Sequence, residues 1–103
     1  MVEIVWTLRA DRHFQETFSR EEEIEPGAGE RLFNEVEKAL EMLRRYPELA
    51  RVYQDPVRRW VLGKRRRTGL FYVPESRGIV VIGLLDLRQS PSVIRRELGL
   101  DRD

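Results

Sequence analysis

The sequence contains no cysteine, which excludes disulfide bonds and thiolate chemistry. Histidine occurs once, at His13, so no second imidazole or thiolate is present to complete a zinc site. The acidic run Glu21–Glu23 could hold a metal ion, but a run of like charges at the end of a helix is typical of a solvated surface. We therefore expect neither a metal nor a cofactor.

Long hydrophobic runs are also missing. The longest one, Gly78–Leu85, is too short to cross a bilayer, which takes about 20 residues as a helix. The N-terminus has no basic segment followed by an apolar stretch, so no signal peptide is expected. Together with the absence of cysteine, this pattern predicts a cytoplasmic protein without a membrane partner.

The length of 103 residues predicts a single domain, 1–103, with one core. Hydrophobic residues make up 41% of the chain, which is enough for a buried core, and charged residues make up 36%. The net charge of +1 hides an asymmetry, because residues 1–50 carry a net charge of −5 and residues 51–103 carry +6. An acidic half and a basic half predict a polar face directed at a polyanion or an acidic partner.

Lysine is scarce, since 17 of the 19 basic residues are arginine. Arginine keeps its charge at all relevant pH values, and its planar fork matches phosphate and carboxylate groups. A genome rich in arginine codons would produce the same excess, so composition leaves its cause open.

The N-terminal half is predicted to form one strand followed by two helices. Val2–Thr7 is rich in β-branched and aromatic residues and predicts a strand. Apolar residues at helical spacing then predict helices over Leu8–Glu23, with Thr7 as N-cap, and over Glu30–Arg45. The link Pro26–Gly29 is short, so the two helices should form an antiparallel hairpin.

The stretch Arg58–Arg88 organises the C-terminal half. It contains three short apolar runs, Trp60–Leu62, Leu70–Val73 and Ile79–Leu87, which are typical of strands. Short links favour antiparallel pairing of consecutive strands, so we expect a three-stranded meander. Leu49–Val57, which precedes it, is interpreted as a connector.

The last strand is apolar on both faces, which indicates a position inside the sheet. Strict alternation would put Val80, Ile82 and Leu84 on one face, with Asp86 and Arg88 continuing that face. Pro91 then begins a short helix over 92–98. The predicted fold class is α+β: an N-terminal strand, an antiparallel helical hairpin, a three-stranded antiparallel meander forming one sheet, and a short C-terminal helix.

A set of basic residues at turns and strand ends is the candidate binding site for a target or partner: Arg58, Arg59, Lys64, Arg65, Arg66, Arg67 and Arg88. Such a cluster could dock a phosphate backbone or an acidic protein segment. The alternative is a solvated hairpin turn whose charges block aggregation at sheet edges. Arg88 is the one weak catalytic candidate, because arginine can stabilise developing phosphoryl charge. Pairing, with either Asp86 or an acidic side chain of a partner protein, is the favoured interpretation of Arg88, since no general base is evident nearby.

Three other side chains, outside this basic set, also have a predicted place. Trp60 and Tyr72 could stack on nucleic-acid bases, although their apolar strands favour a place in the core. His13 lies on the polar side of the first predicted helix and is expected at the surface.

The order of these elements and their local motifs resemble the RelE/ParE superfamily of small bacterial type II toxins. The matching motifs are Arg45-Tyr46-Pro47, the basic strand Arg58–Gly63, Phe71-Tyr72-Val73, the polar turn Glu75–Gly78, the run Ile79–Leu85, and Arg88. They occur in the order that the family shows and cover nearly the whole chain.

The resemblance implies one of two activities. RelE-like members bind the ribosome and cleave mRNA with clustered basic residues and a C-terminal tyrosine or a histidine, whereas ParE-like members poison DNA gyrase. No tyrosine follows Tyr72, and Asp86 stands where many members have histidine, so the sequence is more similar to the ParE-like branch. The resemblance thus implies a plasmid-stabilisation toxin that binds DNA gyrase without catalysis and is neutralised by an acidic antitoxin.

Two alternatives remain open on the sequence. One is a RelE-like, ribosome-dependent mRNA endoribonuclease, and the other is a non-toxic interaction module with the same fold. The sequence also leaves open whether the chain forms a homodimer or assembles only with its antitoxin.

Overall fold

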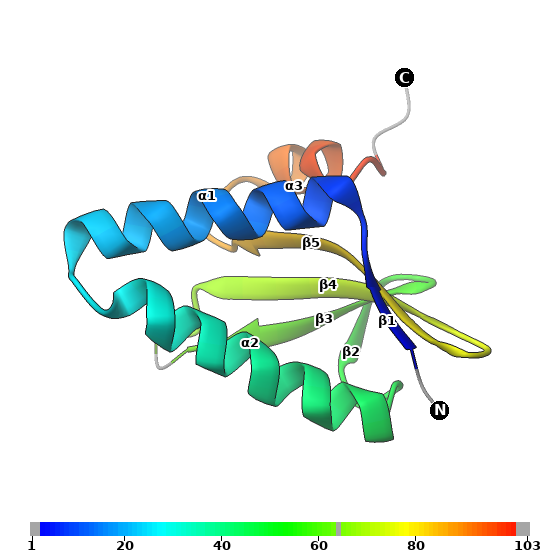
Figure 1. Ribbon diagram of the computed structural model, residues 1–103. Coiled ribbons are helices and arrows are strands. Elements are labelled where there is room, and N and C mark those ends of the chain that lie inside the picture. Colours follow the sequence, from blue (N-terminus) through cyan, green and yellow to red (C-terminus); the bar gives the residue numbers. More distant parts are fainter. Residues whose placement is uncertain (1–2, 64, 101–103) are drawn as a thin grey trace.

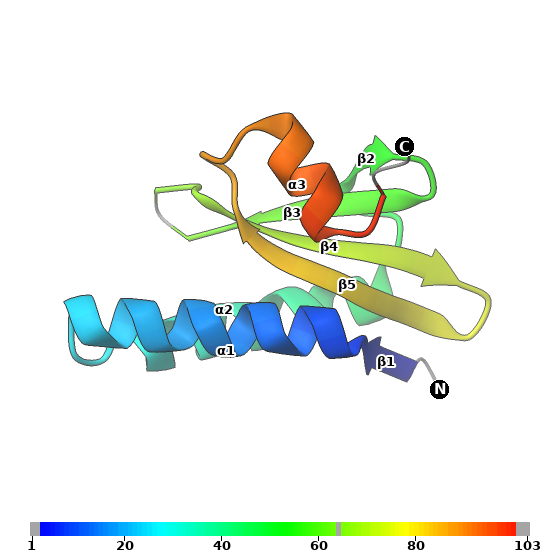
Figure 2. The same ribbon diagram turned by 90° about the horizontal axis from the view of Figure 1, so that it is seen from above.

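The computed structural model describes residues 3–63 and 65–100 of the chain. A five-stranded sheet carries two long helices on one face and a short helix on the other (Figures 1 and 2). The elements follow in the order β1 (Glu3–Trp6), α1 (Leu8–Ile24), α2 (Ala28–Arg45), β2 (Arg51–Gln54), β3 (Val57–Leu62), β4 (Thr68–Glu75), β5 (Gly78–Asp86) and α3 (Pro91–Glu97). The α+β class and this sequence of strand, helical hairpin, sheet and short helix are as predicted.

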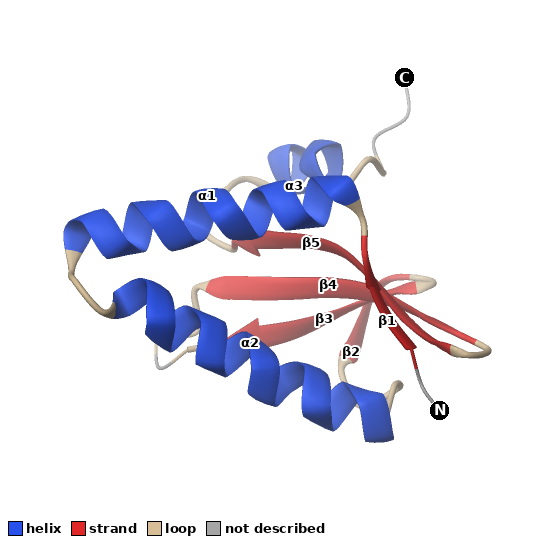
Figure 3. Cartoon of the chain, in the orientation of Figure 1, coloured by secondary structure: helices blue, strands red, loops and turns tan. Residues whose placement is uncertain are grey.

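The sheet has the strand order β1-β5-β4-β3-β2 (Figure 3). The strands β2 to β5 form an antiparallel meander, and β1 lies parallel to β5. The meander therefore has four strands, and the interpretation of Leu49–Val57 as a connector was wrong for its central part. Val52 and Tyr53 favour a strand, and the tight turn at Asp55-Pro56 folds them back onto β3.

Side chains at the helix ends set the shape of the helical hairpin. The Thr7 hydroxyl accepts a hydrogen bond from the Ala10 N–H at 3.0 Å, which makes it the predicted N-cap of α1. The Glu22 carboxylate accepts hydrogen bonds from the N–H groups of Gly27 and Gly29, each at 3.0 Å. Glu22 thus satisfies free N–H groups at the start of α2. The run Glu21–Glu23 was expected to be solvated, but its middle residue has this structural role. These hydrogen bonds, first that of Gly27, lower the pKa of Glu22.

The core has two parts, one on each face of the sheet. Under the long helices it contains Ala10, Leu32, Val36, Ala39, Leu40, Leu43, Ala50, Leu62, Leu70, Tyr72, Ile79, Val81 and Leu84. Under α3 it contains Val57, Phe71, Leu85, Ile94 and Leu98. Tyr72 is fully buried and donates a hydrogen bond to the Pro47 carbonyl at 2.7 Å, so its predicted place in the core is confirmed. Trp60 is half-buried against the same part of the core.

A β-bulge in β5 changes which residues face the helices. Phe71 pairs with Gly83 and Tyr72 pairs with Val81, so Ile82 has no partner on β4. Leu84 therefore packs under α1 and α2, whereas Ile82 packs in the part of the core under α3. The prediction that Ile82 and Leu84 share a face was wrong. It assumed strict alternation along β5, and the extra residue at the bulge reverses the faces of the residues that follow it.

Gly78 provides a test of the pairing between β1 and β5. It lies opposite Glu3, and a methyl group on its Cα would overlap the main chain of Glu3. We expect Gly78→Ala to lower the free energy of unfolding by about 2 kcal/mol, because the backbone of β1 has to move away. Chemical denaturation measures this change. Ser76→Ala, in the exposed turn two residues before Gly78, is the control, and equal stability of the two variants would contradict the close approach of β1.

Candidate functional site

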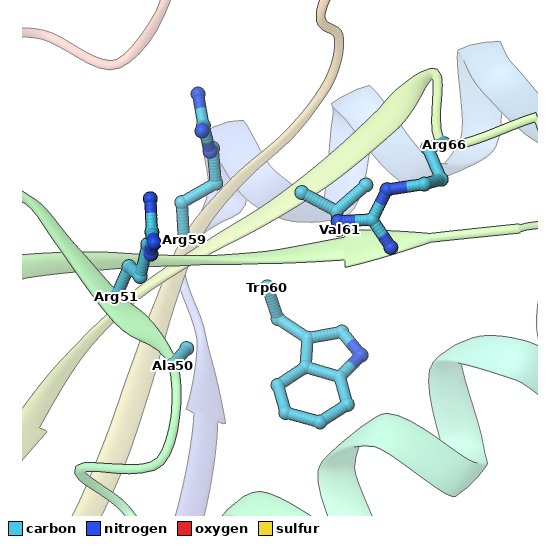
Figure 4. Close-up of a pocket in the computed structure, with 6 residues that line it drawn as sticks. All are labelled: Ala50, Arg51, Arg59, Trp60, Val61 and Arg66. Carbon is cyan, nitrogen blue, oxygen red and sulfur yellow. The ribbon is translucent and has the colours of Figure 1, made fainter.

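The described part of the chain has a surface pocket where β2 begins beside β3 (Figure 4). Its volume is about 480 Å³, and we call it the arginine pocket after three of its lining residues. The lining consists of Ala50, Arg51, Arg59, Trp60, Val61 and Arg66. Two adjacent strands and the turn that follows β3 therefore each bring one arginine to the same place.

Strand alternation decides which side chains reach this pocket. Arg51 pairs directly with Arg59, so both side chains lie on the same face of the sheet. Figure 4 shows Arg51, Arg59 and Val61 on one side of β3 and Trp60 on the other. Arg66 reaches the pocket from the β3–β4 turn, where it adopts a positive φ of 55°.

The three guanidinium groups are available to an external anion. Among the described residues, no carboxylate lies within ion-pair distance of Arg51, Arg59 or Arg66. The guanidinium of Arg59 lies 5.9 Å from the centre of the Tyr53 ring, a distance at which the ring face attracts a cation. The pocket is therefore positively charged, and the Tyr53 ring faces one of its cations.

Arg58, which was a candidate for binding, holds the main chain instead. Its Nη1 donates hydrogen bonds to the carbonyl groups of Glu48 at 3.0 Å and Ala50 at 2.7 Å. Tyr72 donates to the carbonyl of Pro47 in the same link. Arg58 thus fastens the link between α2 and β2 to the sheet.

Arg88 is paired with Asp86, one of the two pairings that the sequence left open. Its Nη2 donates to Asp86 Oδ2 at 2.6 Å and its Nε donates to Asp86 Oδ1 at 3.0 Å. This bidentate hydrogen bonding lowers the pKa of Asp86 and raises that of Arg88. Most of the charge of Arg88 is therefore matched within the chain.

The remaining candidates lie in the β3–β4 turn. Arg65 and Arg67 are exposed, and Lys64 lies outside the described residues. The carbonyl of Arg67 accepts a hydrogen bond from the Leu87 N–H at 2.6 Å, so the main chain of this residue extends the pairing of β4 with β5. Of the six predicted site residues that the structure describes, Arg59 and Arg66 line the pocket.

Arg51 was missed by the sequence analysis because it falls in the segment taken for a connector. Its signal is the short pattern Arg51-Val52-Tyr53, in which a β-branched and an aromatic residue favour a strand. A pairing of this pattern with Arg58-Arg59 would have brought Arg51 and Arg59 together.

His13 is buried, with an exposed fraction of 3%, so the prediction of a surface position was wrong. Its Nδ1 accepts a hydrogen bond from the Leu84 N–H at 3.3 Å, and its Nε2 lies 3.4 Å from Glu97 Oε1. The strand β1 ends at Trp6 and pairs with β5 only as far as Val81. The imidazole therefore takes the place of a strand partner for Leu84 beyond that point.

The environment of His13 favours its neutral form. Burial lowers its pKa, against the opposing effect of Glu97. Because Nδ1 must be unprotonated to accept the Leu84 N–H, the proton of the neutral ring belongs on Nε2, toward Glu97. His13 bridges α1, β5 and α3 and is not among the residues that line the arginine pocket.

No protein-family model and no curated protein matches this chain. Within the described residues, no group of three or more His, Cys, Asp or Glu side chains could hold a metal ion. The same residues include no helix long and apolar enough to cross a membrane. The functional interpretation therefore depends on the sequence motifs and on the geometry of the arginine pocket.

Arg58 and Arg59 are neighbours with different expected roles. We expect Arg58→Ala to reduce the free energy of unfolding by about 1–3 kcal/mol, because it leaves the partly buried Ala50 carbonyl, and the exposed Glu48 carbonyl, without their donor. Arg59→Ala should change stability by about 0.5 kcal/mol or less, since its guanidinium faces the Tyr53 ring and forms no ion pair with another described residue. Urea denaturation of the two variants checks this, and a larger loss for Arg59→Ala would refute the assignment of Arg58 as the structural arginine.

The burial of His13 predicts a loss of stability in mild acid. Its pKa is lower in the folded state than the ordinary 6.5, so the unfolded chain binds the proton more tightly. The contribution of neutral His13 to the free energy of unfolding is complete above pH 6.5. It decreases as the pH falls from 6.5 toward the pKa of His13 in the folded state. The decrease is about 1.4 kcal/mol for each pH unit that separates the folded pKa from the unfolded one. Denaturation midpoints measured at several pH values test this.

His13→Gln supplies the control for that measurement, since its amide can accept the Leu84 N–H but does not titrate. The variant should lose the part of the pH dependence that falls between the folded pKa of His13 and the ordinary value of 6.5. An unchanged pH profile would assign the effect to other groups.

Proposed function

We propose that this protein is the toxin of a type II toxin–antitoxin system of the RelE/ParE kind, and that it acts by binding DNA gyrase. The motifs of the resemblance support this, because they occur in family order over nearly the whole chain. The fold is consistent with it, since the strand, the helical hairpin, the antiparallel strands and the short helix follow one another as the resemblance implies. The cytoplasm is the compartment in which such a toxin meets its target.

The observation that carries a binding function is the convergence of Arg51, Arg59 and Arg66 on one pocket. Arginine forms charge-assisted hydrogen bonds with phosphate and carboxylate groups, but at neutral pH it neither accepts nor readily releases a proton. Cleavage of RNA at a 2′-hydroxyl requires a group that takes a proton and one that gives it. The described lining of the pocket holds no histidine, carboxylate or tyrosine that could do so.

The proposal includes an acidic antitoxin as the main partner. The net charge of +6 in residues 51–103 favours such a partner, and complementary charge speeds association. In the absence of this partner, the exposed arginines would be free to engage an anionic nucleoprotein target.

Inducible expression in bacteria tests the function. We expect expression of the wild-type chain to arrest growth and to disturb DNA supercoiling before it affects translation. A triple variant with Arg51→Gln, Arg59→Gln and Arg66→Gln should fold and lose at least about tenfold in toxicity, because three charge-assisted contacts are removed. Supercoiling of a reporter plasmid and incorporation of labelled amino acids provide the two readouts.

The matched control replaces three exposed arginines outside the pocket, Arg12, Arg44 and Arg96, with glutamine and so has the same net charge. Its toxicity should remain close to that of the wild type. Early loss of translation with intact supercoiling would favour the RelE-like alternative, and normal growth at a high level of folded protein would favour the non-toxic interaction module.

A further inference from the structure

The edge of β3 beside the arginine pocket has no strand partner among the described residues. The pairing of β2 with β3 begins at Arg51, which lies opposite Arg59. Before Arg51 the chain turns away toward α2, while β3 continues to Leu62. The segment Trp60–Leu62 therefore pairs with β4 on one side only.

The hydrogen-bond pattern of the sheet indicates which groups this edge offers. The Leu84 N–H points away from β4, because it donates to His13. In an antiparallel ladder the direction alternates along each strand, so Leu70, opposite Leu84, directs its main-chain groups toward β3. Trp60, opposite Leu70, directs its own groups toward β4. Val61 must then direct its N–H and C=O outward, into the arginine pocket that it lines.

The side chains around this free edge are divided by charge. Arg51, Arg59 and Val61 lie on one side of β3, and the indole ring of Trp60 lies on the other (Figure 4). An added strand would share these two faces, because directly opposite residues point the same way. Its residues should therefore alternate between acidic side chains beside the arginines and apolar side chains beside Trp60.

We propose that the free edge of β3 binds an extended acidic segment of another protein by strand addition. Val61 provides the pair of main-chain hydrogen bonds, and Arg51, Arg59 and Arg66 bind the acidic side chains. This inference rests on the acidic partner of the proposed function and states how that partner is held, and it requires no toxic activity.

Two other occupants fit the edge less well. A nucleic acid could neutralise the arginines but would leave the N–H and C=O of Val61 without a matching partner. A second copy of this chain, added edge to edge, would bring its own arginines against Arg51 and Arg59, and like charges would oppose the contact.

The probe is a fluorescent synthetic peptide with the sequence acetyl-Glu-Val-Glu-Val-Glu-Val-Glu-amide, and its binding to the full chain is measured by fluorescence anisotropy. Arg51→Gln with Arg59→Gln should weaken binding at least about tenfold, since two charge-assisted contacts are lost. Arg12→Gln with Arg96→Gln is the control with equal net charge and should bind like the wild type. Equal binding by the two double variants would overturn the assignment of the pocket.

Strand pairing is tested separately from charge by two N-methylated peptides. One carries methyl groups on the glutamate amides and the other on the valine amides, and only one of these two sets can face β3. We expect one of the peptides to lose at least about tenfold in affinity while the other binds like the parent. Equal affinities of the two would overturn strand addition.

Val61→Pro removes the outward N–H and leaves the pairing with β4 in place, as proline does on edge strands. It should weaken binding of the parent peptide, and slowed hydrogen exchange of the Val61 N–H in the wild-type complex gives the same information without a substitution. Unchanged exchange, or an affinity for octathymidylate equal to that for the peptide, would overturn the proposal. Neither result depends on growth arrest, so failure here is distinguishable from failure of the proposed function.

Discussion

The β-bulge at Ile82 is the constraint on which the two parts of the core depend. By inserting one unpaired residue into β5, it directs Leu84 toward the long helices and Leu85 toward α3. An extra residue without a partner also strengthens the local twist of a strand. Gly83 follows the bulge, and a side chain there would collide with Leu98 and approach His13, so the glycine allows α1 and α3 to meet at this point.

At two of the places in the described sheet where one strand extends beyond its neighbour, the main-chain groups left without a strand partner have different surroundings. Beyond the end of β1, the imidazole of His13 accepts the Leu84 N–H and is covered by α3. Beyond the start of β2, the main-chain groups of Val61 face a pocket lined by arginines. An unpaired edge invites association with another chain, and positive charge restricts which chains can associate. The first edge thus contributes to stability, and the second is suited to recognition.

The arginines divide in the same way. Arg58 binds two main-chain carbonyl groups and Arg88 binds Asp86, so these two serve the fold. Arg51, Arg59 and Arg66 lie around one pocket and face outward. The excess of positive charge in residues 51–103 is therefore not one functional cluster, because part of it is used to fasten loops and strand ends.

The sequence by itself determined the class of fold, because periodic apolar residues, the Thr7 cap and the short links act over a few neighbouring residues. It could also indicate that Arg88 pairs with Asp86, two positions away. The tertiary structure alone decided the positions of His13, Arg51 and Ile82. A buried imidazole at His13 depends on the free N–H of Leu84, 71 residues further along the chain. The alignment of Arg51 with Arg59 depends on the register of two strands, and the bulge at Ile82 on the pairing of two others. Such long-range pairings leave no periodic trace in a single strand, so they are fixed only when the whole sheet assembles.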